Sequence, residues 1–519
     1  MNRALQALAI VAVVAIYAFR LDRAAGLIVD DAWYVLLAKA IAQGDGFRLI
    51  SSAAAPIMPV VPPGFPMLLA PVFLVHPQFP DNVMLLKAIS IAAMIGAGAL
   101  FYFYLVRQRG RPEGQSAVIA FAAVLTPGLV FLATSTVMAE CAFMLAQVAT
   151  VVVLERCNRG HRHGAAALAG VLAAATVLIR TAGVAALIAG VAYLIVRRGW
   201  RAAATFAAAA LVCLVPWLAY SAAHAPTRAE SIEHGGPIAF AYSELLAMQR
   251  PGDPMAGRSG AGDIPARIAR NIVNVFGRDL GGVFVPGFFR GPAESGQEVV
   301  ALGGATGLLH ASMGGARPTL AVSFILSAIV LLGFAGHLRR GPTPAEFLTA
   351  VTIAMVLLVP GRTFRYVLPL APFLWMYLAD GLGAAARGRA AVVRVALVCV
   401  IALQIQDHAQ YVLLKMRSAP PPEWLEDQRE VDDLLTWMNT NLAAEGAVAT
   451  TNPGLVYLRT GRKTLASDDP ARNHARWKAR GVRYLVSLRT IATPSRALGF
   501  RKIYDSPRRR LFVIELSDP

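Results

Sequence analysis

The chain is organised around the stretch Val29-Asp30-Asp31-Ala32-Trp33-Tyr34-Val35-Leu36-Leu37-Ala38-Lys39-Ala40, which follows the first apolar segment and carries two adjacent carboxylates. Apolar residues recur in this stretch at steps of three and four, which is the period of an amphipathic helix. One of the two carboxylates therefore lies at the start of that helix. An Asp at a helix start can be no more than a cap, because Asp is a favoured capping residue. The rest of the chain indicates a larger role.

The composition is that of a membrane protein. Of the 519 residues, 56% are hydrophobic and 15% are charged, and the mean hydropathy is +0.54. A soluble domain averages about 25% charged residues. The net charge of +18 does not indicate nucleic-acid binding, because much of the Lys and Arg falls in short clusters between apolar runs. The four cysteines are far apart and show neither a disulfide framework nor the spacing of zinc ligands.

Apolar runs of nearly membrane-spanning length repeat along the chain and predict about eleven spans. The first run, residues 4–19, is expected to be an uncleaved helix, because many further spans follow it. The others lie at about 82–106, 116–133, 137–154, 165–179, 182–196, 202–222, 320–337, 347–360, 366–382 and 390–404. We therefore expect a mainly α-helical polytopic bundle, with amphipathic helices lying on its outer face.

Basic clusters predict how the bundle is oriented. They occur at residues 107–111, 156–163, 197–201, 337–340 and 387–394. These clusters fall on alternate sides of successive spans, so they share one face, and the positive-inside rule makes that face cytoplasmic together with the N-terminus. The extracytoplasmic face then receives the outer loops 20–81 and 223–319, and it also receives the C-terminal part of the chain.

The C-terminal part has the pattern of a small α/β domain. We predict a transmembrane domain over residues 1–406, a linker over 407–425 around a run of prolines, and an extracytoplasmic domain over 426–519. Within the last of these, the pattern predicts helices at 427–442 and 470–480, strands at 446–451 and 483–488, and a hairpin formed by 500–504 and 511–516.

The first outer loop contains three short motifs: Asp30-Asp31-Ala32-Trp33-Tyr34, the helix end Gly44-Asp45-Gly46, and Pro62-Pro63-Gly64-Phe65-Pro66. Together they resemble the first outer loop of the C-type (GT-C) integral membrane glycosyltransferases. The similarity is to the bacterial branch related to protein O-mannosyltransferases and the lipid A aminoarabinose transferase. The family pattern commonly reads Asp-Glu-Ala-x-Tyr, then Gly-x-Gly, then Pro-Pro-Leu-Tyr-Pro. This sequence departs from the pattern at Asp31, where Glu is usual, and at Gly64-Phe65, where Leu-Tyr is usual.

The resemblance implies a set of site residues. These are Asp30 at the family's catalytic Asp, Asp31 beside it, Tyr34 at the motif's Tyr, Lys87, Glu140 at an outer helix start, Arg180 in a Leu-x-Arg element, and Arg365 in an Arg-Tyr-x-x-Pro segment. Independently of the family, ionisable groups inside spans or at their ends are costly unless they are paired, so they are candidates for a site. Each also has a structural alternative, as a snorkelling anchor, a cap or an ion pair.

The resemblance implies transfer of a sugar from a polyprenyl-phosphate carrier to an envelope glycan, lipid or protein at the extracytoplasmic face. Asp30 and Asp31 are expected in catalysis, with Asp30 as the base and with inversion at the anomeric carbon. Lys87, Arg365, Arg180 and Tyr34 are expected to bind the donor and its phosphate, with Glu140 as a second acidic site. No metal is expected, although Asp31 with Glu140 leaves a divalent ion open.

Two other classes of protein fit part of the pattern. A transporter or flippase of a lipid-linked saccharide would use a similar basic cavity without a base, and would more often show repeats and charges at mid-membrane depth. An O-antigen ligase or polymerase would suit the long outer loop but leaves the Asp-Asp helix unexplained. In each case we expect an integral protein of the inner membrane whose partners are lipids, not nucleic acids.

Overall fold

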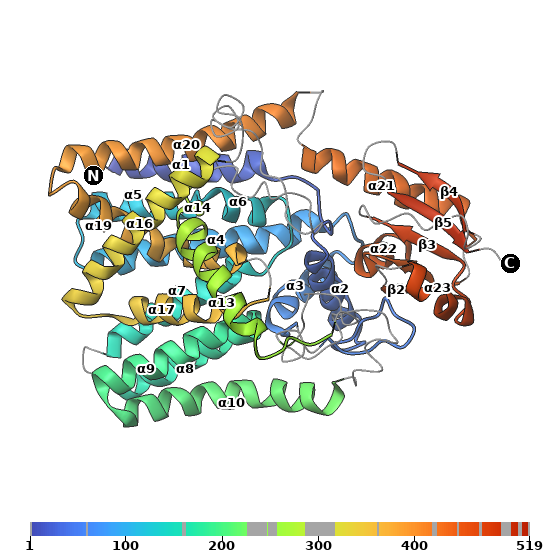
Figure 1. The fold of residues 1–519 in the computed structure, drawn as a ribbon, viewed down its shortest axis with the longest axis horizontal. Helices are drawn as coiled ribbons and strands as arrows, with labels where there is room; N and C mark the ends of the chain where they lie inside the picture. Colours follow the sequence, from blue (N-terminus) through green and yellow to red (C-terminus); the bar gives the residue numbers. More distant parts are fainter. Residues whose placement is uncertain are drawn as a thin grey trace.

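The protein is a bundle of long helices joined to a small C-terminal sheet, with α2 and α3 lying between them (Figure 1). The computed structural model describes residues 3–58, 61–157, 162–225, 247, 257–285, 317–360, 363–417, 423–443, 446–466, 470–488, 500–506 and 511–516. The helices are α1 (Arg3–Arg20), α2 (Asp30–Gln43), α3 (Gly64–Val75), α4 (Val83–Arg107), α5 (Glu113–Val124), α6 (Pro127–Thr134), α7 (Glu140–Arg156), α8 (Arg162–Ile179), α9 (Val184–Arg198), α10 (Trp200–His224), α13 (Asp263–Asn274), α14 (Leu280–Gly282), α16 (Arg317–Arg340), α17 (Pro344–Val356), α18 (Phe364–Val367), α19 (Ala371–Ala385), α20 (Ala390–Met416), α21 (Glu423–Asn441), α22 (Pro453–Thr460) and α23 (Pro470–Ala479). Shorter turns are η2 (Thr181–Gly183), η5 (Val275–Asp279) and η7 (Leu368–Leu370), and the strands are β1 (Val448–Thr450), β2 (Thr464–Ala466), β3 (Tyr484–Ser487), β4 (Phe500–Asp505) and β5 (Phe512–Leu516).

The described residues do not confirm the number of spans that the sequence predicts. Six helical segments are long and apolar enough to cross a membrane, and a seventh is added if the bent pair α5 and α6 counts as one span. The predicted count of about eleven is therefore not confirmed. Several of the apolar runs form shorter helices, among them α8, α17 and the apolar part of α1. Each of these is shorter than the roughly 20 residues that a perpendicular crossing needs.

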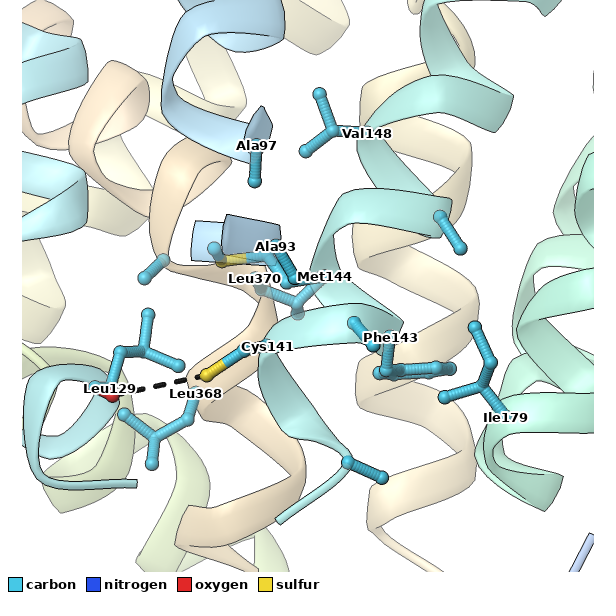
Figure 2. Packing of buried hydrophobic residues seen from close by; sticks show 14 of the residues in the cluster. Ala93, Ala97, Leu129, Cys141, Phe143, Met144, Val148, Ile179, Leu368 and Leu370 are labelled. Atoms are coloured by element: carbon cyan, nitrogen blue, oxygen red, sulfur yellow. Dashed lines mark hydrogen bonds between the residues drawn. The ribbon is translucent and has the colours of Figure 1, made fainter. Parts of the chain in front are cut away.

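Helix α7 lies inside the bundle and is buried along most of its length. Figure 2 shows side chains of α7 packed against α4, α6 and the chain around η7, and the residues labelled there are Ala93, Ala97, Leu129, Cys141, Phe143, Met144, Val148, Ile179, Leu368 and Leu370. Ala93 and Ala97 are four residues apart on one face of α4, and small side chains in this spacing let two helices approach closely. This packing holds Glu140, the first residue of α7, in a fixed place.

The bent pair α5 and α6 meets at an angle of 54°. Such a break frees backbone carbonyls, which need hydrogen-bond donors where water is excluded. Tyr17 Oη of α1 donates to the carbonyl oxygen of Val124 at 2.7 Å. His408 Nε2 of α20 lies 2.9 Å from the carbonyl oxygen of Leu125, which makes this nitrogen the donor. Helices α1 and α20 therefore stabilise the bend.

The first outer loop contains α2 and α3, and two glycines explain its shape. Gly44 ends α2 in the left-handed conformation, with φ of 84°, as a helix-terminating glycine does. Gly64 begins α3, and a Cβ atom there would lie 2.6 Å from the carbonyl oxygen of Leu178 at the end of α8. The departure from the family pattern at Gly64 therefore permits close approach of α3 to α8.

The C-terminal sheet has the strand order β2-β1-β3-β5-β4. Strand β1 is parallel to β2 and to β3, whereas β5 is antiparallel to β3 and to β4. Alternate strand residues face opposite sides of the sheet, so Val448 packs on the side of α21 and α22, and Ala449 packs on the side of Trp477 in α23. This confirms the predicted α/β pattern, to which the structure adds α22 and β2. We refer to α21–α23 with these strands as the C-terminal α/β unit.

The predicted linker between the two domains is not an extended segment where the structure describes it. Helix α20 continues to Met416 and α21 begins at Glu423, so the predicted linker 407–425 is helical over much of its length. Residues 418–422 lie outside the described residues, as does most of the predicted outer loop 223–319. The division into two domains stays a prediction.

Candidate functional site

Four charged side chains from four segments of the chain meet at the start of α2. Arg365 Nη1 donates to Asp30 Oδ2 at 2.8 Å, and Arg365 Nε donates to Glu140 Oε1 at 2.5 Å. Arg180 Nη1 lies 2.6 Å from the same oxygen of Glu140. The structure thus brings together four of the predicted site residues, with alternating charge. We call Asp30, Arg365, Glu140 and Arg180 the Asp30 cluster.

Exposure of the side chains increases along the Asp30 cluster. It is 0% for Glu140, 12% for Arg180, 27% for Arg365 and 47% for Asp30. The buried end consists of an acid shared by two guanidinium groups, because an unpaired charge would cost several kcal/mol there. The open end presents one carboxylate and one guanidinium group. A substrate can therefore reach Asp30 and Arg365 without disturbing the core.

Local backbone structure positions the buried members of this cluster. Glu140 is in the first turn of α7, where the helix dipole favours a negative charge. Arg180 is an extended residue, with φ of −149° and ψ of 135°, between α8 and η2. The chain reverses tightly there, because a Cβ atom on Gly183 would lie 2.3 Å from the backbone carbon of Thr176. This reversal places Arg180 beside Glu140.

Two tyrosines border the Asp30 cluster. Tyr34 is one turn after Asp30 in α2, and its ring makes an edge contact with Phe65 at a centroid distance of 5.1 Å. Burial raises the pKa of Tyr34 to about 12, so its phenol stays neutral and the residue is a hydrogen-bonding group, not a charge. Tyr366 lies 5.9 Å from the Arg180 guanidinium carbon. Tyr366 is not among the predicted site residues, although it directly follows Arg365.

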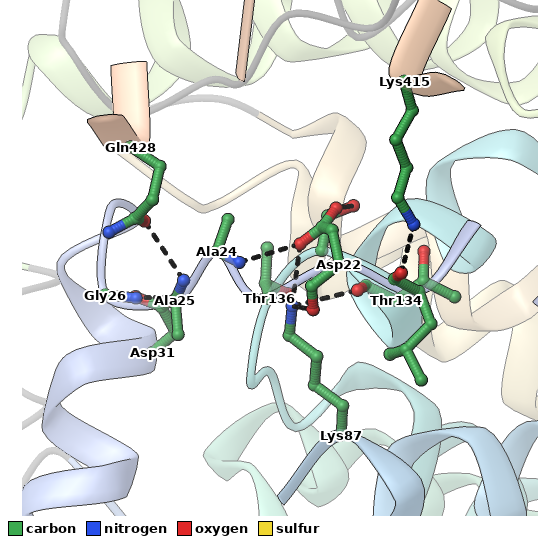
Figure 3. A network of polar contacts seen from close by, with 12 residues as sticks. Asp22, Ala24, Ala25, Gly26, Asp31, Lys87, Thr134, Thr136, Lys415 and Gln428 are labelled. Carbon is green, nitrogen blue, oxygen red and sulfur yellow. Dashed lines mark hydrogen bonds and ion pairs between the residues drawn. The ribbon is translucent and has the colours of Figure 1, made fainter. Parts of the chain in front are cut away.

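Lys87 was predicted to bind the donor phosphate, but the structure does not place it in the Asp30 cluster. Its ammonium group is buried and donates to the carbonyl oxygen of Asp22 at 2.8 Å, to Asp22 Oδ1 at 3.0 Å and to the carbonyl oxygen of Thr134 at 2.9 Å (Figure 3). An ammonium group has three protons, so none remains for a phosphate in this arrangement. Lys87 instead joins the start of the first outer loop to the end of α6 through its hydrogen bonds to Asp22 and Thr134.

Asp31 was predicted to act with Asp30, but it points elsewhere. Its side chain is fully buried, and Asp31 Oδ2 accepts the backbone N–H of Gly26 at 2.7 Å (Figure 3). The other oxygen, Oδ1, has no hydrogen-bond partner among the described residues. Burial raises the pKa of this carboxyl group from 3.8 to about 7. Asp31 therefore supports the loop before α2 instead of facing the exposed end of the cluster.

Replacing Asp31 by Asn is expected to stabilise the protein above neutral pH by about 1–3 kcal/mol, since it removes a poorly solvated buried charge. An unfolded Asp31 releases its proton near pH 3.8, whereas the folded one keeps it to about pH 7. Stability of the wild type therefore falls relative to Asp31→Asn as the pH rises between these values, and the difference is constant above them. Thermal unfolding at pH 5 and pH 8 measures this. Parallel pH curves for the two proteins would contradict it.

The described residues contain no group of three or more His, Cys, Asp or Glu side chains that could hold a metal ion. Asp31 and Glu140, the pair for which a divalent ion was left open, do not form a metal site in this structure either. Asp31 accepts from Gly26, and the two arginines around Glu140 take the place that a cation would occupy. The chemistry this cluster offers directly is a solvent-accessible carboxylate next to guanidinium groups that can bind an anion.

Solved structures with the same fold are C-type (GT-C) membrane glycosyltransferases, which confirms the fold expected from the first outer loop. One is ArnT from Cupriavidus metallidurans bound to undecaprenyl phosphate, with a TM-score of 0.61 and 12% identity over 100% of both chains. Another is the oligosaccharyltransferase AglB from Archaeoglobus fulgidus with an inhibitory peptide and a dolichol-phosphate, with a TM-score of 0.52 and 14% identity over 92% of this chain and 69% of that one. No family model and no curated protein matches the sequence. The apolar helices and this fold together make the chain an integral membrane protein.

Proposed function

We propose that this protein is a glycosyltransferase that moves a sugar from a polyprenyl-phosphate carrier to a cell-envelope acceptor at the extracytoplasmic face of the inner membrane. The observation that carries the proposal is the Asp30 cluster, in which a half-exposed carboxylate shares Arg365 with a buried ion-pair network. Two structures of the same fold support it, since one is bound to undecaprenyl phosphate and the other to a dolichol-phosphate. Both of those ligands are lipid phosphates.

In the proposed reaction Asp30 accepts the proton of the acceptor hydroxyl. At the same time, the oxygen of that hydroxyl attacks the anomeric carbon of the sugar. The bond between that carbon and the phosphate oxygen breaks, and the electron pair leaves with polyprenyl phosphate. Arg365 stabilises the charge that develops on the phosphate, because one guanidinium group can donate two parallel hydrogen bonds to phosphate oxygens. Arg180 keeps Glu140 neutralised when Arg365 turns toward the phosphate. The active site is thus the open end of the Asp30 cluster.

Basic residues at the ends of several helices support the proposed orientation of the site. Helix α7 begins at Glu140 and ends at Arg156, and its 17 residues extend about 25 Å. Basic residues also lie in the last turns of α4, α9 and α16. These ends are expected in the cytoplasm, so the Asp30 cluster lies at the extracytoplasmic side. Carrier-linked donors are therefore required, because nucleotide-sugar donors are cytoplasmic.

Vesicles containing the purified protein and a labelled polyprenyl-phosphate sugar distinguish this proposal from transport. A transferase converts the donor only when an envelope acceptor is supplied, and it leaves the distribution of intact donor between the leaflets unchanged. A transporter or flippase equilibrates the intact donor between the leaflets without an acceptor. Equilibration without any conversion would overturn the proposed function.

The product is expected to have inverted configuration at the anomeric carbon. Only one carboxylate of the Asp30 cluster is exposed, so the geometry supports a single displacement rather than a glycosyl-enzyme intermediate formed by a second carboxylate. Nuclear magnetic resonance of the product formed from a donor of known configuration measures this directly. Complete retention of configuration would contradict the assignment of Asp30 as a base.

A further inference from the structure

The segment between α1 and α2 is held at one end by the helix bundle and at the other by the C-terminal α/β unit (Figure 3). At the bundle end, Tyr411 Oη of α20 donates to Asp22 Oδ2 at 2.6 Å. Closer to α2, the backbone N–H of Ala25 donates to Gln428 Oε1 of α21 at 3.2 Å. The residue that begins α2, Asp30, therefore follows a short segment that both parts of the protein hold.

Gly26 lies against the C-terminal α/β unit. Its φ of +88° lies in the left-handed region that favours glycine, and a Cβ atom there would lie 2.6 Å from Leu455 Cδ1. Its N–H donates to Asp31 Oδ2 at 2.7 Å, and its carbonyl oxygen accepts Asn452 Nδ2 at 2.6 Å. Both backbone groups of Gly26 are thus used, one by α2 and one by the C-terminal α/β unit.

Asn452 makes two hydrogen bonds with different functions. Its Oδ1 accepts the backbone N–H of Leu455 at 3.2 Å, which caps α22. Its Nδ2 donates to Gly26, outside the C-terminal α/β unit. The first bond needs only a side-chain oxygen, whereas the second needs the amide nitrogen. A substitution can therefore remove the second bond and keep the first.

Helix α22 also packs directly on the first turn of α2. A Cβ atom on Gly454 would lie 3.2 Å from the Cβ atom of Ala32. Ala32 is fully buried in the same hydrophobic cluster as Val431 and Leu455 of the C-terminal α/β unit. The turn that carries Asp30 is therefore part of the core of this unit, while its carboxylate contacts Arg365 of the bundle.

We propose that Asn452 is a positioning residue for Asp30: by holding Gly26, it determines where α2 begins and how Asp30 is presented to Arg365. The C-terminal α/β unit is then needed for the geometry of the active site and is more than an appended domain. This inference rests on the proposed function, since it assigns Asn452 to the same site. A displacement of a catalytic group by about 1 Å can lower turnover about 100-fold.

The test uses Asn452→Asp in the full-length protein. Asp and Asn cap helices equally well, so α22 keeps its cap, but a carboxylate cannot donate to the carbonyl oxygen of Gly26. The matched control is Asn441→Asp at the end of α21, where the exposed Asn441 Nδ2 donates to the carbonyl oxygen of Trp437 at 2.9 Å. Each variant loses one hydrogen bond from a side-chain amide to a backbone carbonyl oxygen. Only the bond lost in Asn452→Asp reaches the segment before α2.

We expect Asn452→Asp to lower kcat at least tenfold with the KM for the donor unchanged within about twofold, and Asn441→Asp to change neither. Gly26→Ala acts on the same contact from the side of the loop, so it is expected to give the same split of kcat from KM. It also provides the test if Asn452→Asp does not accumulate as folded protein. Full turnover in both variants that act on Gly26 would overturn the inference and leave the proposed function intact.

Hydrogen exchange at the amides of Gly26 and Asp31 supplies a readout that does not depend on activity. Both amides donate within this contact, to Asp31 Oδ2 and to the carbonyl oxygen of Ile28. Their exchange is expected to become at least tenfold faster in Asn452→Asp and to remain unchanged in Asn441→Asp. If the wild type converts no donor, the proposed function fails while this readout still tests the contact. Unchanged exchange in Asn452→Asp would overturn the inference.

Discussion

Replacement of Asp30 by Asn is expected to lower kcat by about 10²–10⁴-fold, the contribution of a general base, while the affinity for the lipid-linked donor stays within a few fold. An amide of the same size cannot accept the proton of the acceptor hydroxyl. Arg365 keeps its pairing with Glu140 in this variant, so the cation proposed to bind the donor phosphate remains in place. Loss of the ion pair between Asp30 and Arg365 changes stability little, because the Asp30 side chain is 47% exposed.

Asp45→Asn is the matched control for this experiment. Asp45 directly follows the glycine that ends α2, and its side chain is exposed. Asp45→Asn therefore also replaces a carboxylate by an amide, but at the other end of α2. Steady-state kinetics and donor titration of the two variants should separate them by at least 100-fold in kcat. Equal activity of Asp30→Asn and Asp45→Asn would exclude Asp30 as the base.

Replacement of Glu140 by Ala is expected to destabilise the protein by about 3–5 kcal/mol, which is the cost of removing one partner from a buried ion pair. Glu140 is fully buried and neutralises Arg180 and Arg365 at once. Without it, Arg180 keeps its charge but loses its ion pair with Glu140, and the ring of Tyr366 at 5.9 Å does not replace a carboxylate. Thermal unfolding of the solubilised protein measures the loss.

Two further variants isolate the cause of this effect. Glu113→Ala removes an exposed acid from the first turn of α5 and is expected to cost less than about 1 kcal/mol. The double variant Glu140→Leu with Arg180→Met removes both charges from the buried end, so it should recover part of the stability lost in Glu140→Ala. A double variant less stable than Glu140→Ala would show that packing, and not the uncompensated charge, causes the loss.

The Asp30 cluster was largely predictable from the sequence, whereas the partners of its neighbours were not. Asp30, Glu140, Arg180 and Arg365 were selected through the resemblance and as costly charges near span ends, and they meet in the structure. The prediction for Asp31 rests on the resemblance, because Asp31 stands where the family pattern usually has Glu. Adjacent residues of a helix point about 100° apart, and in this structure Asp30 contacts Arg365 whereas Asp31 contacts Gly26.

Lys87 illustrates what a single sequence does not reveal. A lysine near the outer end of a span has the same appearance whether it binds a substrate or a buried acid. Its partner, Asp22, lies 65 residues away in sequence and gives no pattern of its own. The span count of about eleven is not confirmed for a related reason, since hydropathy does not distinguish a short buried helix from a complete crossing. The partner of Lys87 is revealed only by a contact between distant segments.

The contact between the C-terminal α/β unit and α2 was also beyond sequence reasoning. The helices and strands of this unit follow from their periodicity, and most of them occur where the pattern predicts. The contact includes a hydrogen bond between the carbonyl oxygen of Gly26 and the amide of Asn452, which are 426 positions apart. Neither residue belongs to a motif that the sequence analysis identified.

The most direct test of the central claim is the stoichiometry of carrier release. Purified wild-type protein in vesicles receives a polyprenyl-phosphate sugar and an envelope acceptor, and both polyprenyl phosphate and glycosylated acceptor are quantified. The proposed transfer predicts one molecule of polyprenyl phosphate released for each sugar transferred, and a release at least about 100-fold slower in Asp30→Asn. The contrary result is that the wild type and Asp30→Asn both bind lipid-linked sugars but release no carrier with any donor and acceptor tested. That result would contradict the assignment of this protein as a transferase.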